Sequence, residues 1–273
     1  MNKTTDEVIR FCIVTTQRSG STWLMDLLAS HPRVRAYNEV FIPERWHRVQ
    51  RKPGVSELYA AMQPQLYFYQ FQARSRRPRP WATFDYLDLI CAPSAEYDAV
   101  GFKLMLDQWK RHLELTWKLK RDAYRVVHLI RENFLDSLIS TEMVRKRGIP
   151  HASRDLPPDQ VYIDPATLVH RLGRLERQRR RGEWLLRVAG LPVLRLTYEG
   201  LCEDPEGAIG SISDFLGVER RPLRSELKKL NRAAHWESIA NYEEVRRALA
   251  GTAYESLLGV PMQGESMAVE LGR

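Results

Sequence analysis

The stretch "FCIVTTQRSGSTWLMDLLAS", residues 11–30, decides the fold class of this 273-residue chain. Residues 11–15 form an apolar run that predicts a buried strand, and residues 22–30 carry apolar side chains at helical spacing. The polar residues between them predict a tight turn. A strand, a turn and a helix bring backbone N–H groups and the positive end of a helix dipole to one place. This stretch therefore predicts an anion-binding loop.

Apolar runs of similar length recur along the chain at residues 100–105, 125–130 and 192–197. Short, nearly continuous apolar runs are typical of parallel strands that are covered on both faces. Helical patterns lie between most of them, at residues 107–120 and 133–147, and after two Asp-Pro pairs that predict helix starts, Asp164-Pro165 and Asp204-Pro205. This alternation predicts an α/β fold with a P-loop-type, doubly wound parallel sheet flanked by helices.

The chain length fits one large domain, and the sequence contains no internal repeat or long low-complexity tract. We expect an N-terminal tail over residues 1–9 and a single domain over residues 10–273. Residues 45–97, which are rich in aromatic side chains, predict an irregular insertion beside the sheet. Residues 258–273 predict a C-terminal tail.

Composition narrows the setting in which the protein works. No apolar run reaches the roughly 18–20 residues that cross a bilayer, and "MNKTTDEVIR" lacks the apolar core of a secretory signal. The three cysteines lie far apart and have no metal-binding spacing. We therefore expect a cytoplasmic protein with no bound metal.

The formal net charge of +8 favours an anionic partner. Residues 171–187 hold seven arginines and two glutamates, and residues 73–81 form a basic stretch broken by prolines. The first segment fits either a solvated helix face or a docking surface for an anionic lipid, glycan or subunit. The second fits either a lid near the substrate or a plain connection. The sequence leaves both alternatives open.

The loop differs from the Walker A motif of nucleoside triphosphatases, G-x-x-x-x-G-K-[ST]. Ser21 stands where that motif has its lysine, and Thr15 stands where it has its first glycine. Without the lysine that reaches the β- and γ-phosphates, triphosphate chemistry has little support. Arg18 instead supplies a permanent positive charge just before the small residues.

Three segments together resemble the sulfotransferases that use 3′-phosphoadenosine 5′-phosphosulfate (PAPS). They are "QRSGSTW", the strand and helix "YRVVHLIRENFLDSLIS", and the late segment "VLRLTYEGLCEDPEGAIGSISDFLGV". The resemblance extends over about residues 10–249, and it is closest to the bacterial carbohydrate enzymes of the nodulation-factor and sulfolipid type. It implies the α/β fold described above and PAPS as the sulfate donor.

The resemblance also implies which residues bind the donor. The 5′ end of PAPS is expected to bind the loop residues Arg18, Ser19, Gly20, Ser21 and Thr22. The 3′-phosphate falls to Arg131 and Ser140, with Ser137 a less apt substitute for the serine. An ion pair between Arg131 and Asp136 is the structural alternative.

Two aromatic residues fit either the nucleotide or the protein interior. Trp23 is expected to stack on the adenine or to belong to the core, and Tyr198 to hydrogen-bond the adenine or to be a buried structural tyrosine.

Sulfuryl transfer is an in-line displacement in which the acceptor oxygen attacks sulfur, so the site needs a charge on the leaving phosphate and a base for the acceptor proton. Arg18 fits the first task. The resemblance implies Glu39, in "RAYNEVFIP", as the base. The histidine that the cytosolic phenol and steroid enzymes use is absent, because "KLM", residues 103–105, occupies that place.

We expect the acceptor to be a carbohydrate or glycolipid hydroxyl, while a peripheral contact with membrane headgroups and a homodimer both stay open. Two other function classes compete with this hypothesis. A small-molecule kinase would need magnesium and a substitute for the Walker lysine. A non-enzymatic anion-binding module would be built on residues 171–187. Because the sequence lacks zinc, helix-turn-helix and stacking-platform motifs, we expect no nucleic-acid partner.

Overall fold

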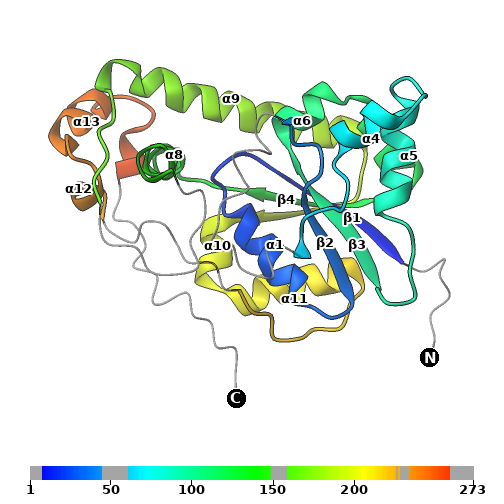
Figure 1. The fold of residues 1–273 in the computed structure, drawn as a ribbon. Coiled ribbons are helices and arrows are strands. Elements are labelled where there is room, and N and C mark those ends of the chain that lie inside the picture. The colour runs from blue at the N-terminus through cyan, green and yellow to red at the C-terminus, as the bar shows by residue number, and fades with distance from the viewer. Residues whose placement is uncertain (1–7, 45–60, 149–158, 226, 228–233, 259–273) are drawn as a thin grey trace.

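The computed structural model describes residues 8–44, 61–148, 159–225, 227 and 234–258. Five parallel strands form one sheet in the order β2-β3-β1-β4-β5, with helices on both faces (Figure 1). The strands are β1 (Ile9–Thr15), β2 (Val34–Glu39), β3 (Ala99–Met105), β4 (Arg125–Ile130) and β5 (Val193–Thr197). This architecture confirms the predicted doubly wound parallel sheet.

Strand β2 was not among the predicted strands, although it ends in the candidate base, Glu39. Its side chains alternate between buried and half-buried along the edge of the sheet, so it presents no continuous apolar run. The strand pairs with β3 and brings Tyr37 opposite Phe102 before the register shifts near Glu39. Its carboxyl end therefore meets the same edge of the sheet as the loop after β1.

The helices of the described chain surround the sheet, and their bounds are α1 (Ser21–Ala29), α4 (Phe68–Arg74), α5 (Trp81–Ile90), α6 (Leu106–Arg111), α7 (Glu114–Arg121), α8 (Phe134–Arg147), α9 (Pro165–Ala189), α10 (Tyr198–Glu203), α11 (Pro205–Leu216), α12 (His235–Ser238) and α13 (Tyr242–Leu249). A short 3₁₀ helix, η2 (Glu255–Leu258), follows. Asp164 and Asp204 cap α9 and α11, as the two Asp-Pro pairs predict.

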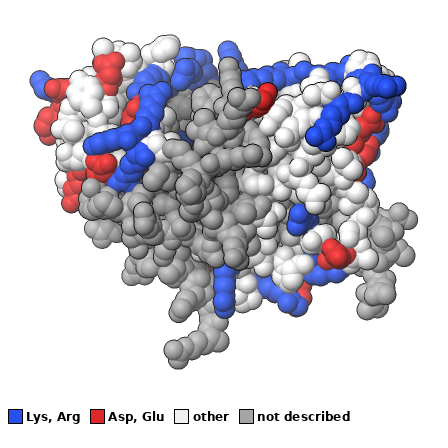
Figure 2. Space-filling model, in the orientation of Figure 1, with Lys and Arg blue, Asp and Glu red and all other residues white. Residues whose placement is uncertain are grey.

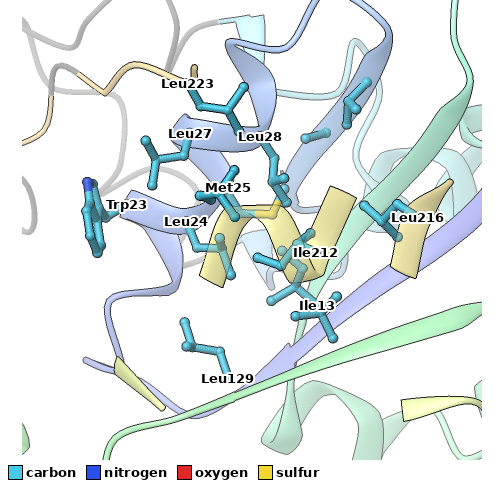
Figure 3. Packing of buried hydrophobic residues seen from close by; sticks show 14 of the residues in the cluster. Ile13, Trp23, Leu24, Met25, Leu27, Leu28, Leu129, Ile212, Leu216 and Leu223 are labelled. Carbon is cyan, nitrogen blue, oxygen red and sulfur yellow. The ribbon is translucent and has the colours of Figure 1, made fainter. Parts of the chain in front are cut away.

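One apolar layer lies between the sheet and the helices α1 and α11. Leu24 and Leu28 of α1, Ile212 and Leu216 of α11, and Ile13 of β1 pack together there, and none is more than 4% exposed (Figure 3). A second layer on the other face takes side chains from α5, α6, α7 and the C-terminal part of α9. A third cluster joins α8 to α13 and the N-terminal part of α9. These layers hold the carboxyl edge of the sheet in place.

Two sequence-based expectations were wrong. The predicted helix 107–120 is two helices, because the backbone at His112 leaves the helical region and ends α6. The predicted irregular insertion contains α4 and α5 in its described part, 61–97, and the buried side chains of Phe68 and Tyr86 join the second apolar layer. Both aromatic residues had made this segment look irregular, but they serve its packing against the sheet.

The basic stretch 73–81 covers the end of α4, the connection and the start of α5. Within the connection, Arg77 pairs with Asp85 of α5 and Arg79 pairs with Glu114 of α7, so two ion pairs hold it against these helices. Residues 1–7, 45–60 and 259–273, which include most of the two predicted tails and part of the predicted insertion, lie outside the described residues. Among the helices that the structure describes, none is long and apolar enough to cross a membrane.

Candidate functional site

The loop between β1 and α1 lies at the point where the strand order reverses, because β1 has β3 on one side and β4 on the other. In open parallel sheets, ligands bind beyond the carboxyl ends of the strands at such a point. Arg18 and Gly20 both have left-handed backbone conformations, with φ of 61° and 78°. Helix α1 begins directly after them, so several N–H groups converge as in the anion-binding nests of other proteins.

Hydroxyl groups fix the shape of this loop from within. Thr15 Oγ1 donates to the Leu129 carbonyl oxygen on β4 at 2.8 Å, and Ser19 Oγ donates to the Thr16 carbonyl oxygen at 2.9 Å. The Ser19 side chain is fully buried, and its Oγ lies in contact with Thr15 Oγ1. The hydroxyl of Ser19 thus holds the loop, which leaves its backbone as the part that faces a ligand.

Tyr198, the first residue of α10, packs directly on Gly20. A Cβ atom at position 20 would lie 2.2 Å from Tyr198 Cδ2, so only glycine fits there. Trp23 meets the same ring edge to face, with 6.4 Å between the ring centroids. Both aromatic side chains are 7% exposed and belong to the apolar layer under α1, with Trp23 at one end of the group (Figure 3). Their primary visible role is therefore packing beside the loop.

Two arginines from distant parts of the sequence meet at the loop. Arg18 Nε donates to Ser140 Oγ at 2.9 Å, and Arg131 Nη1 donates to the Arg18 carbonyl oxygen at 3.3 Å. The Arg131 guanidinium also lies over the Tyr198 ring, 4.6 Å from its centroid. The structure thus brings together Arg18, Arg131, Ser140 and Tyr198, and Ser140, which the motifs assign with Arg131 to the 3′-phosphate, hydrogen-bonds Arg18.

Burial and the neighbouring Arg131 charge lower the pKa of Arg18 to about 10. Both causes act against the charged form, because the guanidinium loses water and faces a like charge. A negatively charged ligand at the loop would offset both effects.

Arg131 also forms the ion pair with Asp136 that the sequence offered as an alternative, with 2.9 Å between Nη2 and Oδ2. The other oxygen of Asp136 lies 2.8 Å from His235 Nε2 on α12. His235 is a residue that the motifs did not single out. Arg131 Nε is buried and has no hydrogen-bond partner among the described residues. Since a guanidinium has five N–H donors, the ion pair does not exhaust Arg131.

The carboxylate of Glu39, at the end of β2, is held from two sides. Its Oε1 lies 3.2 Å from Lys103 Nζ, and its Oε2 accepts a hydrogen bond from Gln108 Nε2 at 2.9 Å. Lys103 Nζ also donates to Thr22 Oγ1 at 3.1 Å, so one ammonium group connects the carboxylate to the phosphate loop. The Glu39 side chain is 20% exposed, which leaves the carboxylate open to a ligand.

Sequence reasoning used the segment 103–105 as part of a family match and to exclude a histidine, but it assigned no role to Lys103. The lysine is 2% exposed in a strand whose other side chains are apolar or absent. Burial lowers its pKa, whereas the attraction of Glu39 opposes that change. A charged residue inside an otherwise apolar strand is a usable sign, because a buried charge needs a partner.

Comparison with known proteins identifies the family. Residues 11–222 match the sequence model described as the sulfotransferase family. A search of curated proteins returns no significant match. Among the described residues, no group of His, Cys, Asp and Glu side chains is arranged to hold a metal ion.

Three solved structures illustrate the similarity. A sulfotransferase from Alicyclobacillus acidocaldarius is 16% identical, with 90% of this chain and 94% of that chain covered and a TM-score of 0.43. A sulfotransferase domain from the curacin biosynthetic pathway is 14% identical, with coverage of 96% and 95% and a TM-score of 0.47. A mouse sulfotransferase, SULT7A1, complexed with PAP, is 15% identical, with coverage of 79% and 61% and a TM-score of 0.35. Because the family model matches most of the chain, the protein belongs to the sulfotransferase family and is a sulfotransferase enzyme.

Proposed function

We propose that this enzyme transfers the sulfuryl group of PAPS to an acceptor hydroxyl. The observation that carries the proposal is the pair of guanidinium groups at the loop, where burial and Arg131 together lower the pKa of Arg18. Two cations that repel each other beside a helix N-terminus fit a ligand with more than one phosphate. PAPS carries such groups at its 5′ and 3′ positions.

The donor is proposed to lie across the loop and the start of α8. The N–H groups of residues 19–22 and the guanidinium of Arg18 would hold its 5′ end. Arg131, through its unpartnered Nε, and Ser140 would hold its 3′-phosphate. The Asp136 carboxylate, fixed by His235, would keep the guanidinium of Arg131 in this orientation. Trp23 and Tyr198 would form the wall that meets the adenine.

Glu39 is proposed as the general base. In the transfer step the acceptor oxygen forms a bond to sulfur, the bond from sulfur to the 5′-phosphate oxygen breaks, and the acceptor proton passes to the Glu39 carboxylate. Lys103 pairs with that carboxylate, and Gln108 orients it. The negative charge that develops on the leaving phosphate would be met by Arg18 and the loop N–H groups.

The acceptor is proposed to be a hydroxyl on a carbohydrate or glycolipid. The enzyme is proposed to act in the cytoplasm, and residues 10–273 are proposed to form its single domain. The support is the resemblance of the motifs to the bacterial carbohydrate enzymes. The aromatic residues near the site give little support for a sugar platform, because Tyr67 and Tyr86 are buried. Trp81, which is 48% exposed, is an aromatic side chain that a sugar ring could reach.

Two measurements test the donor and the reaction. Calorimetric titration with PAP, without added metal, is expected to show saturable binding. Incubation with sulfur-labelled PAPS and a panel of sugars and glycolipids is expected to yield a labelled product, which mass spectrometry identifies. A protein that ignores PAP but transfers labelled phosphate from ATP would contradict the proposal.

The base is tested by Glu39→Gln. Loss of a general base predicts a fall in turnover of about 10²–10⁴-fold while PAP binding remains. Glu243→Gln is the matched control, because it removes the same charge from an exposed carboxylate that pairs with Arg246 at the surface. Full turnover by Glu39→Gln would show that another group takes the proton.

A further inference from the structure

A cavity of about 530 Å³ lies beside the phosphate loop, between helices α6, α8 and α9. Gln17 of the loop forms part of its wall. Its basic lining residues are Lys110, Arg145, Arg171, Arg174, Arg177 and Arg181. Asp107 is the single acidic residue among those lining the cavity. On the molecular surface, Lys and Arg side chains gather along the edge that α9 forms (Figure 2).

Most of this positive charge is not neutralised within the protein. Glu142, at the rim, pairs with both Arg145 and Arg171. By contrast, the side chains of Lys110, Arg174, Arg177 and Arg181 form no ion pair with any described residue. The cavity is therefore lined by four basic side chains that form no ion pair with a described residue, and Asp107 is the acidic side chain beside them.

The spacing of the cavity-lining arginines on α9 places like charges next to one another, which lowers the stability of the helix. Arg174 and Arg177 are three residues apart, and Arg177 and Arg181 are four apart, so like charges are neighbours on one helix. Elsewhere on α9, Arg180 pairs with Glu176 and Arg179 pairs with Glu183, each at four-residue spacing, whereas Arg187 forms no ion pair with a described residue. Solvated helix faces commonly carry such pairs. Of the four α9 arginines that form no ion pair with a described residue, Arg174, Arg177 and Arg181 line the cavity and Arg187 does not.

The cavity adjoins the groups proposed for catalysis. Gln17 directly precedes Arg18, and Thr141 directly follows Ser140, which binds Arg18. Helix α6 contacts both places, because its Gln108 binds Glu39 while its Lys110 lines the cavity. A molecule in the cavity would therefore lie beside the phosphate loop, and α6 connects the wall of the cavity to the base.

We propose that this cavity binds the acceptor, and that the acceptor is an acidic saccharide whose carboxylate or sulfate groups meet the arginines of α9. The inference rests on the proposed sulfuryl transfer and adds the chemical class of its acceptor. The unpaired arginines hold the anionic groups, and this places a neighbouring hydroxyl at the base. The basic segment 171–187 is then a substrate-binding wall on one side and a solvated face, with Arg179 and Arg180 in ion pairs, on the other.

The test compares two triple variants of equal charge. Arg174→Gln, Arg177→Gln and Arg181→Gln together form the cavity variant. Arg180→Gln, Arg187→Gln and Arg221→Gln form the control, since these exposed arginines do not line the cavity. Calorimetry on PAP-loaded protein measures binding of a chondroitin 4-sulfate tetrasaccharide, which carries carboxylates and sulfates, and of the neutral chitotetraose.

We expect the wild type and the control to bind the acidic tetrasaccharide and to discriminate against the neutral one. The cavity variant is expected to bind the acidic one about tenfold or more weakly, as the loss of three charge contacts predicts, with a smaller dependence on salt. Binding of PAP is expected to be equal in all three proteins.

Each alternative outcome has a distinct meaning. Equal binding of the acidic tetrasaccharide by the cavity variant and the control overturns the inference, and so does its failure to bind the wild type. Failure of the wild type to bind PAP instead overturns the proposed donor site. Even then, weaker binding of the acidic tetrasaccharide by the cavity variant alone would support an acidic ligand for the cavity. Stronger binding of the neutral tetrasaccharide by the wild type would also overturn the inference.

Discussion

The ion pair between Glu39 and Lys103 can be measured through a double-mutant cycle with Glu39→Gln and Lys103→Met. At the 3.2 Å that separates Nζ and Oε1, the attraction of two unit charges is about 5 kcal/mol at an effective dielectric constant of 20. Desolvation of both groups offsets part of it. Because Glu39 is 20% exposed whereas Lys103 is almost fully buried, we expect a net coupling of about 2–3 kcal/mol.

The assay is chemical denaturation of the wild type, both single variants and the double variant, with the free energy of unfolding compared around the cycle. Each single variant leaves one charge without its partner, and Glu39→Gln is expected to be the more destabilising because the orphaned Lys103 is the more buried. The double variant is expected to be less destabilised than the sum of the two. A coupling below about 0.5 kcal/mol, the level at which independent sites add, would refute this account of the pair.

Three further predictions follow from the loop and its supports. Arg131→Ala removes charge-assisted hydrogen bonds and is expected to weaken PAP binding about tenfold or more by calorimetry, whereas Arg220→Ala, at an exposed pair with Asp214, leaves it unchanged. Gly20→Ala places a side chain at φ +78° against Tyr198, so the free energy of unfolding should fall by about 2 kcal/mol, and equal stability would contradict the packing described. His128 is buried, and burial with Arg195 and Arg179 lowers its pKa to about 4, so the folded protein holds it neutral. Stability is therefore expected to fall by up to about 3 kcal/mol as pH drops from 6.5 to 4, and denaturation of His128→Leu should show a smaller fall.

The sequence was sufficient for most of the sheet, because β1, β3 and β4 are largely buried and read as nearly continuous apolar runs, and the half-buried edge strand β5 still has a mostly apolar sequence. It was insufficient for β2, whose edge position gives alternating burial instead. The break at His112 was also beyond a periodicity argument, since the residues on both sides keep helical spacing. The insertion was misjudged because its aromatic residues pack against the sheet from short helices.

The candidate site divides in the same way. The loop and the Arg131–Ser140 segment form local motifs, so the sequence could identify both and predict that they meet. The partners that fix them are single residues on other elements, such as Lys103, Gln108 and His235. The lone charge in an apolar strand marks Lys103, whereas the local sequence does not show what Gln108 and His235 contact. The unpaired state of the arginines on α9 depends on where each side chain points, so composition alone could not separate the cavity side from the solvated side.

The register between β1 and β4 has a further consequence for how the protein opens. Thr15 at the end of β1 is paired with Leu129 of β4, so the loop and Arg131 follow two strands that are adjacent at their carboxyl ends. A ligand that contacts both the loop and Arg131 links two segments that are more than a hundred residues apart in the sequence. At 100 times its dissociation constant it adds about 2.7 kcal/mol to every opening that parts these strands. Amide hydrogen exchange in β1 and β4 would slow accordingly. Local openings of α4 and α5 do not separate β1 from β4, so amide exchange in these helices would keep its rate.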